Sequence, residues 1–297
     1  MDKQITPNKV GIYYKAFDYL PTHEDRFKRL RDIGFDSVDI SFADTDTGKY
    51  YHVEKMEEQC AHIRSVAEKY NVTISQVHGP WPTDDETEEG IKWGIECMHK
   101  AVYGTYLLGA KYLVIHPQMP FGYAHDTDPD YAEQRTVDLL RELVPDCEKY
   151  GVTVCLENMP FRNQRISPVR NIVRAVEKAN SKHIGICFDT GHCNCMGDDV
   201  AEAVRLAAPY LKVFHIHDNN MNTFDAHLLP TMGNIDWESF AKAVADIGFD
   251  GTLSLESGAP KLSFMDEPAI EANEKLAFAV ADRLRKMVLE FKKEKAE

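Results

Sequence analysis

The chain alternates short β-branched segments with amphipathic helical segments along its whole length, and this alternation constrains the fold more than any other feature. Eight segments have the composition of strands and lie at 9–14, 37–42, 72–78, 112–117, 152–157, 184–189, 211–217 and 252–256. Helical periodicity occupies the intervals, for example at 23–34 and 53–70, and a helix rich in Lys and Glu is expected at 270–295. Eight strands that alternate with helices predict an α/β fold, the (β/α)8 or TIM barrel.

Local signals indicate short connections from helices to strands. Gly34, Gly151 and Asn180 each end a helical pattern a few residues before a strand, as helix C-caps do. A helix is also expected over 131–151, with a kink or a break at Pro145. An open doubly wound sheet is the alternative fold. The segment IYYKAFDYLP at the first strand lacks the glycine-rich phosphate turn of its nucleotide-binding versions, which favours the barrel.

Composition limits the class of protein. The chain has no linker, low-complexity tract or composition break, so residues 1–297 are predicted to form a single TIM-barrel domain. A formal net charge of -14 argues against a broad basic surface for nucleic acid. No apolar signal core opens the sequence, and no run approaches the ~20 apolar residues of a membrane span. Seven cysteines without a CxxC spacing are typical of reduced thiols, so a cytoplasmic location is expected.

Metal-binding types of residue stand at the carboxyl ends of the predicted strands, where TIM barrels carry their active sites. The last six strands end in or near such groups, which are His78, His116, Glu157, Asp189, His215 with His217, and Glu256. Three more lie in the following loops, namely His192, Asp225 and His227. Any one of these residues alone is more often a hydrogen-bonded loop or strand residue than a ligand. Their gathering at one barrel mouth indicates a shared function.

A divalent cation is the simplest reason for three carboxylates to converge. Buried carboxylates repel one another and are costly to desolvate unless a cation neutralises them. Glu157, Asp189 and Glu256, with His215, form a set that suits Mn, Mg or Co better than a closed zinc tetrahedron. His217 carries less weight than His215. A second, nitrogen-rich group would suit zinc if it bound metal, and it comprises His78, His116, His192, Asp225 and His227.

Five motifs together resemble the xylose isomerase-like TIM barrel superfamily. They are LENMP (156–160), FDTGHCNCMGDD (188–199), FHIHDNN (214–220), DAH (225–227) followed by GNIDW (233–237), and LSLE (253–256). The superfamily joins sugar isomerases and epimerases, inosose dehydratases and endonuclease IV-like AP endonucleases. The resemblance covers nearly the whole chain and is specific for the superfamily rather than for one member. Members of the superfamily often associate, so a homo-oligomer is an open expectation.

The resemblance implies two different sites. In the sugar epimerase branch, Glu157, Asp189, His215 and Glu256 would hold one Mn-like ion. Glu157 and Glu256 would also exchange protons with a ketose from opposite faces, and His192 would bind a substrate oxygen. In the nuclease branch all nine positions would be zinc ligands, namely His78, His116, Glu157, Asp189, His192, His215, Asp225, His227 and Glu256. This sequence has an acceptable residue at each of them.

The loops favour a sugar over DNA. The loops after the third and fourth strands, GPWPTDDETEEG and QMPFGYAHDTDPDY, are acidic and aromatic, whereas a DNA enzyme needs cations for phosphates. Ala226 stands where the nuclease family would place an arginine. Residues expected to contact a substrate are His78, His116, Trp81, Arg162 and His227. Further residues considered near the mouth are the aromatic Phe121, Tyr123 and Phe161 and the cationic Lys15, Lys49, Arg165 and Lys261.

The sequence therefore predicts a metal-dependent isomerase or epimerase that acts on a small carbohydrate or polyol through an enediolate. Glu157 and Glu256 form the expected acid–base pair, and His192 assists. One divalent ion is expected, Mn first, and Mg, Co or Zn would also suit the site. A dehydratase or lyase of keto-sugars or 3-oxo-glycosides would use the same first step. Two further candidate functions are an AP endonuclease with three zinc ions and a catalytically silent barrel that binds a ligand or a partner. The identity of the sugar is left open.

Overall fold

The computed structural model describes residues 7–42, 53–80, 87–118, 128–221, 224–259 and 263–296. Its strands are β1 (Val10–Tyr13), β2 (Ser37–Ser41), β3 (Thr73–His78), β4 (Tyr112–Ile115), β5 (Thr153–Glu157), β6 (Ile184–Asp189), β7 (Leu211–His215) and β8 (Leu253–Leu255). Its helices are η1 (Tyr14–Phe17), α1 (His23–Ile33), α2 (Val53–Lys69), α3 (Glu88–Leu107), α4 (Pro129–Tyr150), α5 (Val169–Ala179), α6 (Thr190–Met196), α7 (Val200–Ala207), α8 (Trp237–Asp246) and α9 (Glu267–Glu294). Trp81, Phe121, Tyr123, Lys49 and Lys261 lie outside the described residues.

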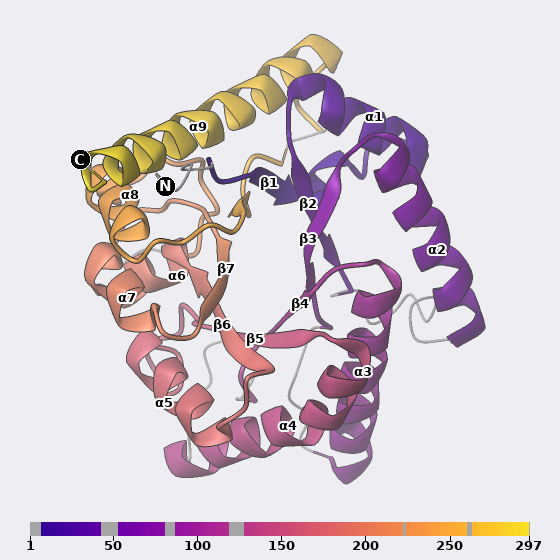
Figure 1. Cartoon of the computed structure of the whole chain (residues 1–297), viewed down its shortest axis with the longest axis vertical. Helices are drawn as coiled ribbons and strands as arrows, with labels where there is room; N and C mark the ends of the chain where they lie inside the picture. The colour runs from indigo at the N-terminus through magenta and orange to yellow at the C-terminus, as the bar shows by residue number, and fades with distance from the viewer. Residues whose placement is uncertain are drawn as a thin grey trace.

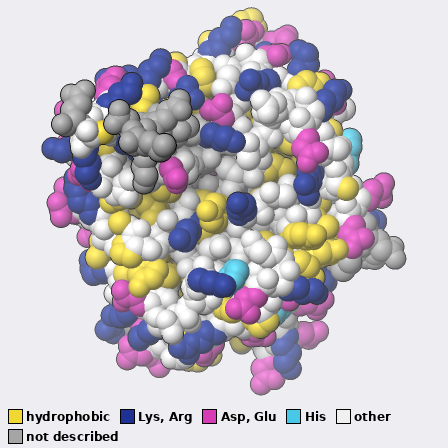
Figure 2. Space-filling model, viewed as in Figure 1, with side chains coloured by type: hydrophobic (Ala, Val, Ile, Leu, Met, Phe, Trp, Pro, Cys, Tyr) yellow, Lys and Arg dark blue, Asp and Glu magenta, His cyan; other side chains and the backbone are white. Residues whose placement is uncertain are grey.

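The eight strands form a (β/α)8 TIM barrel, as predicted. They are parallel and follow the order β7-β6-β5-β4-β3-β2-β1-β8, and a parallel bridge between Ile216 and Leu255 joins the two ends. The helices surround the strands as an outer ring (Figure 1). On the face seen in Figure 2, Lys and Arg side chains intermix with Asp and Glu side chains over the surface of this ring.

Helix boundaries follow local capping chemistry. The side chains of Thr22, Asp128 and Asp236 accept hydrogen bonds from first-turn N–H groups of α1, α4 and α8. Gly34, Gly151 and Asn180 are the C-caps of α1, α4 and α5, which confirms the three predictions. Gly151 and Asn180 adopt the left-handed conformation typical of this position. Of the kink or break expected at Pro145, the break does not occur, because α4 continues through this residue as one 22-residue helix. The loss of one backbone donor is tolerated in so long a helix.

Alternating side chains divide the core into two layers. Phe214 faces outward from β7 and packs against Phe240 of α8 and Phe249, with ring centroids 5.5 and 4.8 Å apart. Its neighbour Val213 faces the barrel interior and joins a separate buried cluster with Val114, Cys155 and Cys187. The next inward residue on β7 is His215, at the carboxyl end of the strand. Strand alternation thus places the polar groups of the mouth directly above the apolar cluster of the barrel interior.

Two further observations concern the chemical environment. All seven cysteines are free and buried. Within the described ranges, every helix is too short or too polar to serve as a membrane span.

Candidate active site

His215 lies at the centre of a buried polar cluster in the barrel mouth. Its Nδ1 is 2.7 Å from Oε1 of Glu157 and 3.5 Å from Oε2 of Glu256, and its Nε2 is 2.9 Å from Oδ2 of Asp39. Each of Glu157, Asp189, His215 and Glu256 offers one ligand atom, and these atoms lie within 4.8 Å of one another. The structure therefore brings together the four residues that the sequence suggested as one metal site.

Strand pairing explains why these residues meet. Asp189 of β6 pairs directly with His215 of β7, and Glu157 of β5 pairs with Cys187, which is two residues before Asp189. Glu256 follows β8, and its N–H donates to the carbonyl of Ile216 across the closing seam of the barrel. Parallel neighbours therefore deliver their carboxyl-terminal side chains to one level of the mouth.

The donor set fits a divalent cation. Oδ1 of Asp189 accepts a hydrogen bond from the N–H of His192 at 2.6 Å, but its Oδ2 is buried and receives no hydrogen bond from the described residues. Oε2 of Glu256 is also buried and receives no hydrogen bond from the described residues. Buried carboxylate oxygens without donors are costly, and a cation would satisfy them. Three oxygen donors and one imidazole nitrogen suit Mn, Mg or Co.

The five residues of the nitrogen-rich group all line the same cavity, but their ligand atoms fall into two sets. His78 and His116 lie on the β3–β4 side with Glu157, and their Nε2 atoms are 3.6 and 3.2 Å from its Oε2. His192, Asp225 and His227 gather on the β6–β7 side, and His217 joins them. Both His192 and His227 place Nε2 against Oδ2 of Asp225, at 3.1 and 2.9 Å.

His217 is a member of this second group, although it was not expected there from the sequence. The ring is fully buried and stacks on His227, with ring centroids 4.1 Å apart. Its Nε2 is 3.0 Å from Oδ1 of Asp189 and 3.5 Å from Oδ1 of Asp225. From the sequence, His215 carries more weight than His217 because only one of the pair need coordinate an ion, and in the structure His215 ends β7 whereas His217 follows the strand. Their partners separate them, because His215 contacts Glu157 whereas His217 contacts Asp189 and Asp225.

The charges of the site follow from burial and close neighbours. Burial raises the pKa of Glu157, but the adjacent His215 and His116 rings outweigh this effect and hold the pKa well below its ordinary value. Burial lowers the pKa of His116 to about 4, and contact with Glu157 offsets only part of that. Burial also lowers the pKa of His227, but Asp225 reverses the effect and raises it to about 9. At neutral pH, Glu157 is therefore a carboxylate and His116 a neutral imidazole.

Among the described residues, two cavities border the cluster. The larger, about 510 Å³, is lined by the β1 end and by His78, His227 and Glu256, and Lys15 and Asp18 lie on its wall. The smaller, about 220 Å³, shares His78, His227 and Glu256 and adds His116, Glu157, Met159, Pro160, Phe161, His192 and Asp225. Both are concave and combine apolar walls with a few polar groups, as ligand sites do.

Some expected contacts do not reach these cavities. Arg162 is not among the described residues that line either one, and its Nε donates to the carbonyl of Cys195 at 2.7 Å. Arg165 is exposed, with Nη1 3.7 Å from Oδ1 of Asp130. Trp81 falls outside the described residues, so its substrate contact stays a prediction. Lys15 lines the larger cavity and Phe161 the smaller one, although neither was among the expected substrate contacts.

Sequence reasoning missed Asp39 and Gln76. Both are buried, and Asp39 lines the larger cavity. The predicted strand 37–42 did contain the signal, because a carboxylate within a buried strand needs a partner. That strand does not end in Asp39, so a search limited to strand ends overlooked it.

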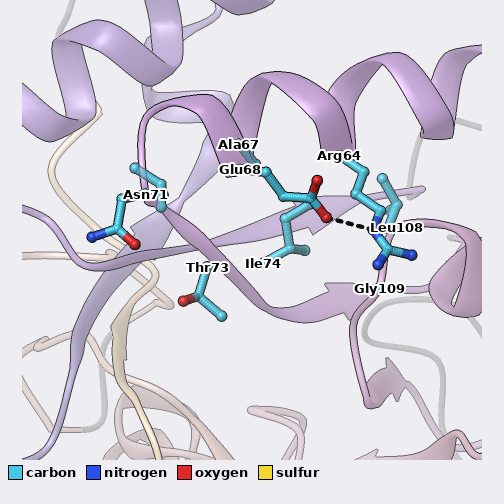
Figure 3. Close-up of a pocket in the computed structure, with 9 residues that line it drawn as sticks. Arg64, Ala67, Glu68, Asn71, Thr73, Ile74, Leu108 and Gly109 are labelled. Atoms are coloured by element: carbon cyan, nitrogen blue, oxygen red, sulfur yellow. Dashed lines mark hydrogen bonds and ion pairs between the residues drawn. The ribbon is translucent and has the colours of Figure 1, made fainter.

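A third cavity, about 310 Å³, lies at the opposite end of the barrel. It is lined by residues of α2, the amino-terminal end of β3 and the end of α3, and these include Thr73 and Leu108 (Figure 3). Arg64 and Glu68 on its wall pair with each other at 2.9 Å. None of the candidate ligands lines this cavity among the described residues.

The fold and site define a metal-ligand-rich TIM barrel, and the chain belongs to the xylose isomerase-like TIM barrel family, whose model matches residues 27–287. The D-psicose 3-epimerase of Ruminiclostridium cellulolyticum is 25% identical over 259 residues, which are 84% of this chain and 83% of that protein. A probable endonuclease 4 of Mycoplasma mobile is 23% identical over 202 residues, 64% of this chain and 69% of that protein. The crystal structure of a D-tagatose 3-epimerase-like protein superposes with a TM-score of 0.75 and 25% identity, and it covers 95% of this chain and 98% of that one.

Proposed function

We propose that this protein is a divalent-metal-dependent isomerase or epimerase of a small carbohydrate or polyol. The observation that carries the proposal is the placement of Glu157 and Glu256. Both carboxylates lie beside Nδ1 of His215, at 2.7 and 3.5 Å, and both line the smaller cavity. Two carboxylates at one cavity are the groups needed to remove a proton from a substrate carbon and to return it. The relatives named as 3-epimerases support this class of reaction.

The roles of the residues follow from their positions. A bound divalent ion, Mn by preference, would supply Lewis-acid stabilisation of negative charge on a substrate oxygen. Glu157 is ionised at neutral pH and would take the proton from carbon, and Glu256 would return it, or the two would act in reverse order. His192 and His227 line the same cavity and would bind substrate hydroxyls. Return of the proton to the other face of the same carbon gives epimerisation, and return to the neighbouring carbon gives isomerisation.

Two related activities share parts of this site. Loss of a β-hydroxyl or a glycosidic oxygen after the same proton removal would give a dehydratase or a lyase. An AP endonuclease is the second candidate function, because all nine positions that the nuclease branch uses lie in the three neighbouring ligand groups. The acidic loops and Ala226 weigh against it. Free buried thiols accord with a reducing, cytoplasmic location.

The decisive experiment is proton exchange in D2O followed by NMR. Ketoses, inososes and 3-oxo-glycosides are incubated with the Mn-loaded protein, and deuterium uptake at the substrate carbon is measured. Glu157→Gln and Glu256→Gln are each expected to abolish exchange, because the amide cannot accept the proton. Glu148→Gln, on the exposed face of α4, is the control and should exchange at the normal rate. Incision of an abasic DNA duplex without any sugar exchange would establish the nuclease instead.

A further inference from the structure

The inner end of His215 is held by a carboxylate that no metal group includes. Nε2 of His215 lies 2.9 Å from Oδ2 of Asp39, which stands on β2 across the barrel interior. Both side chains are almost completely excluded from solvent, at 1% and 4% exposure. Asp39 contacts His215 but belongs to none of the candidate ligand groups found among the described residues. A buried carboxylate needs a hydrogen-bond donor, and Nε2 of His215 is placed to supply one.

Gln76 fixes the orientation of that carboxylate. Its Nε2 donates to the same Oδ2 of Asp39 at 3.0 Å and to the carbonyl of Phe214 at 3.3 Å. A backbone carbonyl only accepts hydrogen bonds, so the amide nitrogen, not the oxygen, must face it. Gln76 therefore ties Asp39 of β2 to the residue that precedes His215 on β7. The bridge crosses the barrel and holds the carboxylate against the imidazole.

The two nitrogens of His215 thus face different surroundings. Nδ1 faces Glu157 and Glu256, and Nε2 faces Asp39. We propose that Asp39 is a positioning residue, which keeps a proton on Nε2 of His215 and so leaves Nδ1 as the ligand nitrogen for the cation. A histidine that donates its second N–H to a carboxylate is fixed in ring orientation and tautomer and is a stronger ligand. Gln76 supports the same arrangement one step further from the ion.

The inference rests on the proposed function only in so far as His215 is a metal ligand. It is tested with zinc alone, without any sugar, so that its failure is separate from the failure of the sugar reaction. Zinc is diamagnetic, and long-range ¹H–¹⁵N NMR of the zinc-loaded, ¹⁵N-histidine-labelled protein reports which nitrogen carries the proton. The expected spectrum of the wild-type protein has Nε2 of His215 protonated and Nδ1 bound to zinc.

Three variants complete the test. Asp39→Ala removes the acceptor, and zinc affinity, measured by competition with a chelator, should fall about 10- to 100-fold. Asp39→Asn should recover part of that loss, because the donors from Gln76 and His215 would both orient the amide oxygen toward them. Ser37→Ala is the matched control, since Ser37 is also buried and lies two residues away on the same strand, and its hydroxyl has no hydrogen-bond partner among the described residues. It should bind zinc as the wild type does.

The outcomes are distinct from one another. A proton on Nδ1 of His215 in the zinc-loaded wild-type protein would overturn the inference whether or not the variants fold. So would wild-type zinc affinity in a folded Asp39→Ala variant, or the absence of zinc binding to the wild-type protein. Normal zinc binding with Nε2 protonated, but without deuterium exchange in any sugar, would uphold the role of Asp39 and reject the sugar reaction.

Discussion

The ring of His217 lies directly on the backbone of Gly191. A β-carbon at Gly191 would be 1.9 Å from Cε1 of His217 and 2.2 Å from its Nδ1. Both residues are buried, so neither can move toward solvent without disturbing its neighbours. His217 can therefore stack on His227 only because position 191 of α6 has no side chain. This contact explains why a glycine follows Asp189 and Thr190 at the start of a helix.

Gly191→Ala should displace the His217 ring and cost about 1–3 kcal/mol of unfolding free energy, the usual cost of overpacking. Denaturant unfolding measures the loss, and a crystal structure of the variant would show the ring moved. Gly94→Ala is the control, because a β-carbon there meets nothing within 4 Å. In α3 it should be neutral or stabilise by up to about 1 kcal/mol. An unmoved His217 in Gly191→Ala would contradict the prediction.

Asp218 supports the loop after β7 and is not a ligand candidate, although it stands next to His217. Its oxygens accept hydrogen bonds from four donors, the N–H groups of Asn219, Thr231 and Ile235 and Nε1 of Trp237. Asp218→Ala leaves these donors without an acceptor and should cost about 2–4 kcal/mol in chemical denaturation. Asp246→Asn alters an exposed pair with Arg205 and should cost under about 1 kcal/mol. Equal losses in the two variants would show that Asp218 has no special structural role.

Glu133 gives stability a pH dependence that is separate from the active site. Burial raises its pKa, but Arg174 and Lys178 outweigh burial and hold the pKa below its ordinary value of 4.5. The ionised group therefore stabilises the folded protein above pH 4.5, and this contribution is lost as the pH falls through the lower folded-state pKa. Glu133→Gln should cost about 1–2 kcal/mol at pH 7, less than a fully buried pair because Arg174 and Lys178 are partly exposed.

The measurement for Glu133 is unfolding in urea from pH 7 down to pH 3. The difference between the wild-type protein and Glu133→Gln should be constant above about pH 4.5 and should shrink below it. Glu202→Gln, which alters a pair exposed on α7, should differ little from the wild type at any pH. A difference that grows toward acid pH would contradict the expected direction.

Removal of bound metal should destabilise the protein. A site that binds an ion only in the folded state adds about 2.7 kcal/mol when the free ion is 100 times its dissociation constant. A chelator should therefore lower the melting temperature, and Mn should restore it. A variant that combines Glu157→Gln with Glu256→Gln should respond to neither addition, because two of the four candidate ligands are neutral. Metal analysis should find about one Mn per chain for the sugar enzyme and about three zinc ions for the nuclease.

The sequence by itself determined the barrel and the residues at its mouth. Strand composition, helix periodicity and caps such as Gly151 and Asn180 are local properties, so the sequence is enough to predict them. The rule that parallel strands deliver their last residues to one rim then placed Glu157, Asp189 and Glu256 together.

Only the tertiary structure decided how the rim is divided and what lies beneath it. His78 and His116 fall into a different ligand set from His192, and His217 joins the set of His192. Asp39 contacts His215. These relationships depend on where each side chain points inside the barrel. Positions 39 and 215 are 176 residues apart in sequence, and no local pattern relates them. Their meeting follows from closure of the barrel, because that alone brings the inward face of β2 opposite the inward face of β7.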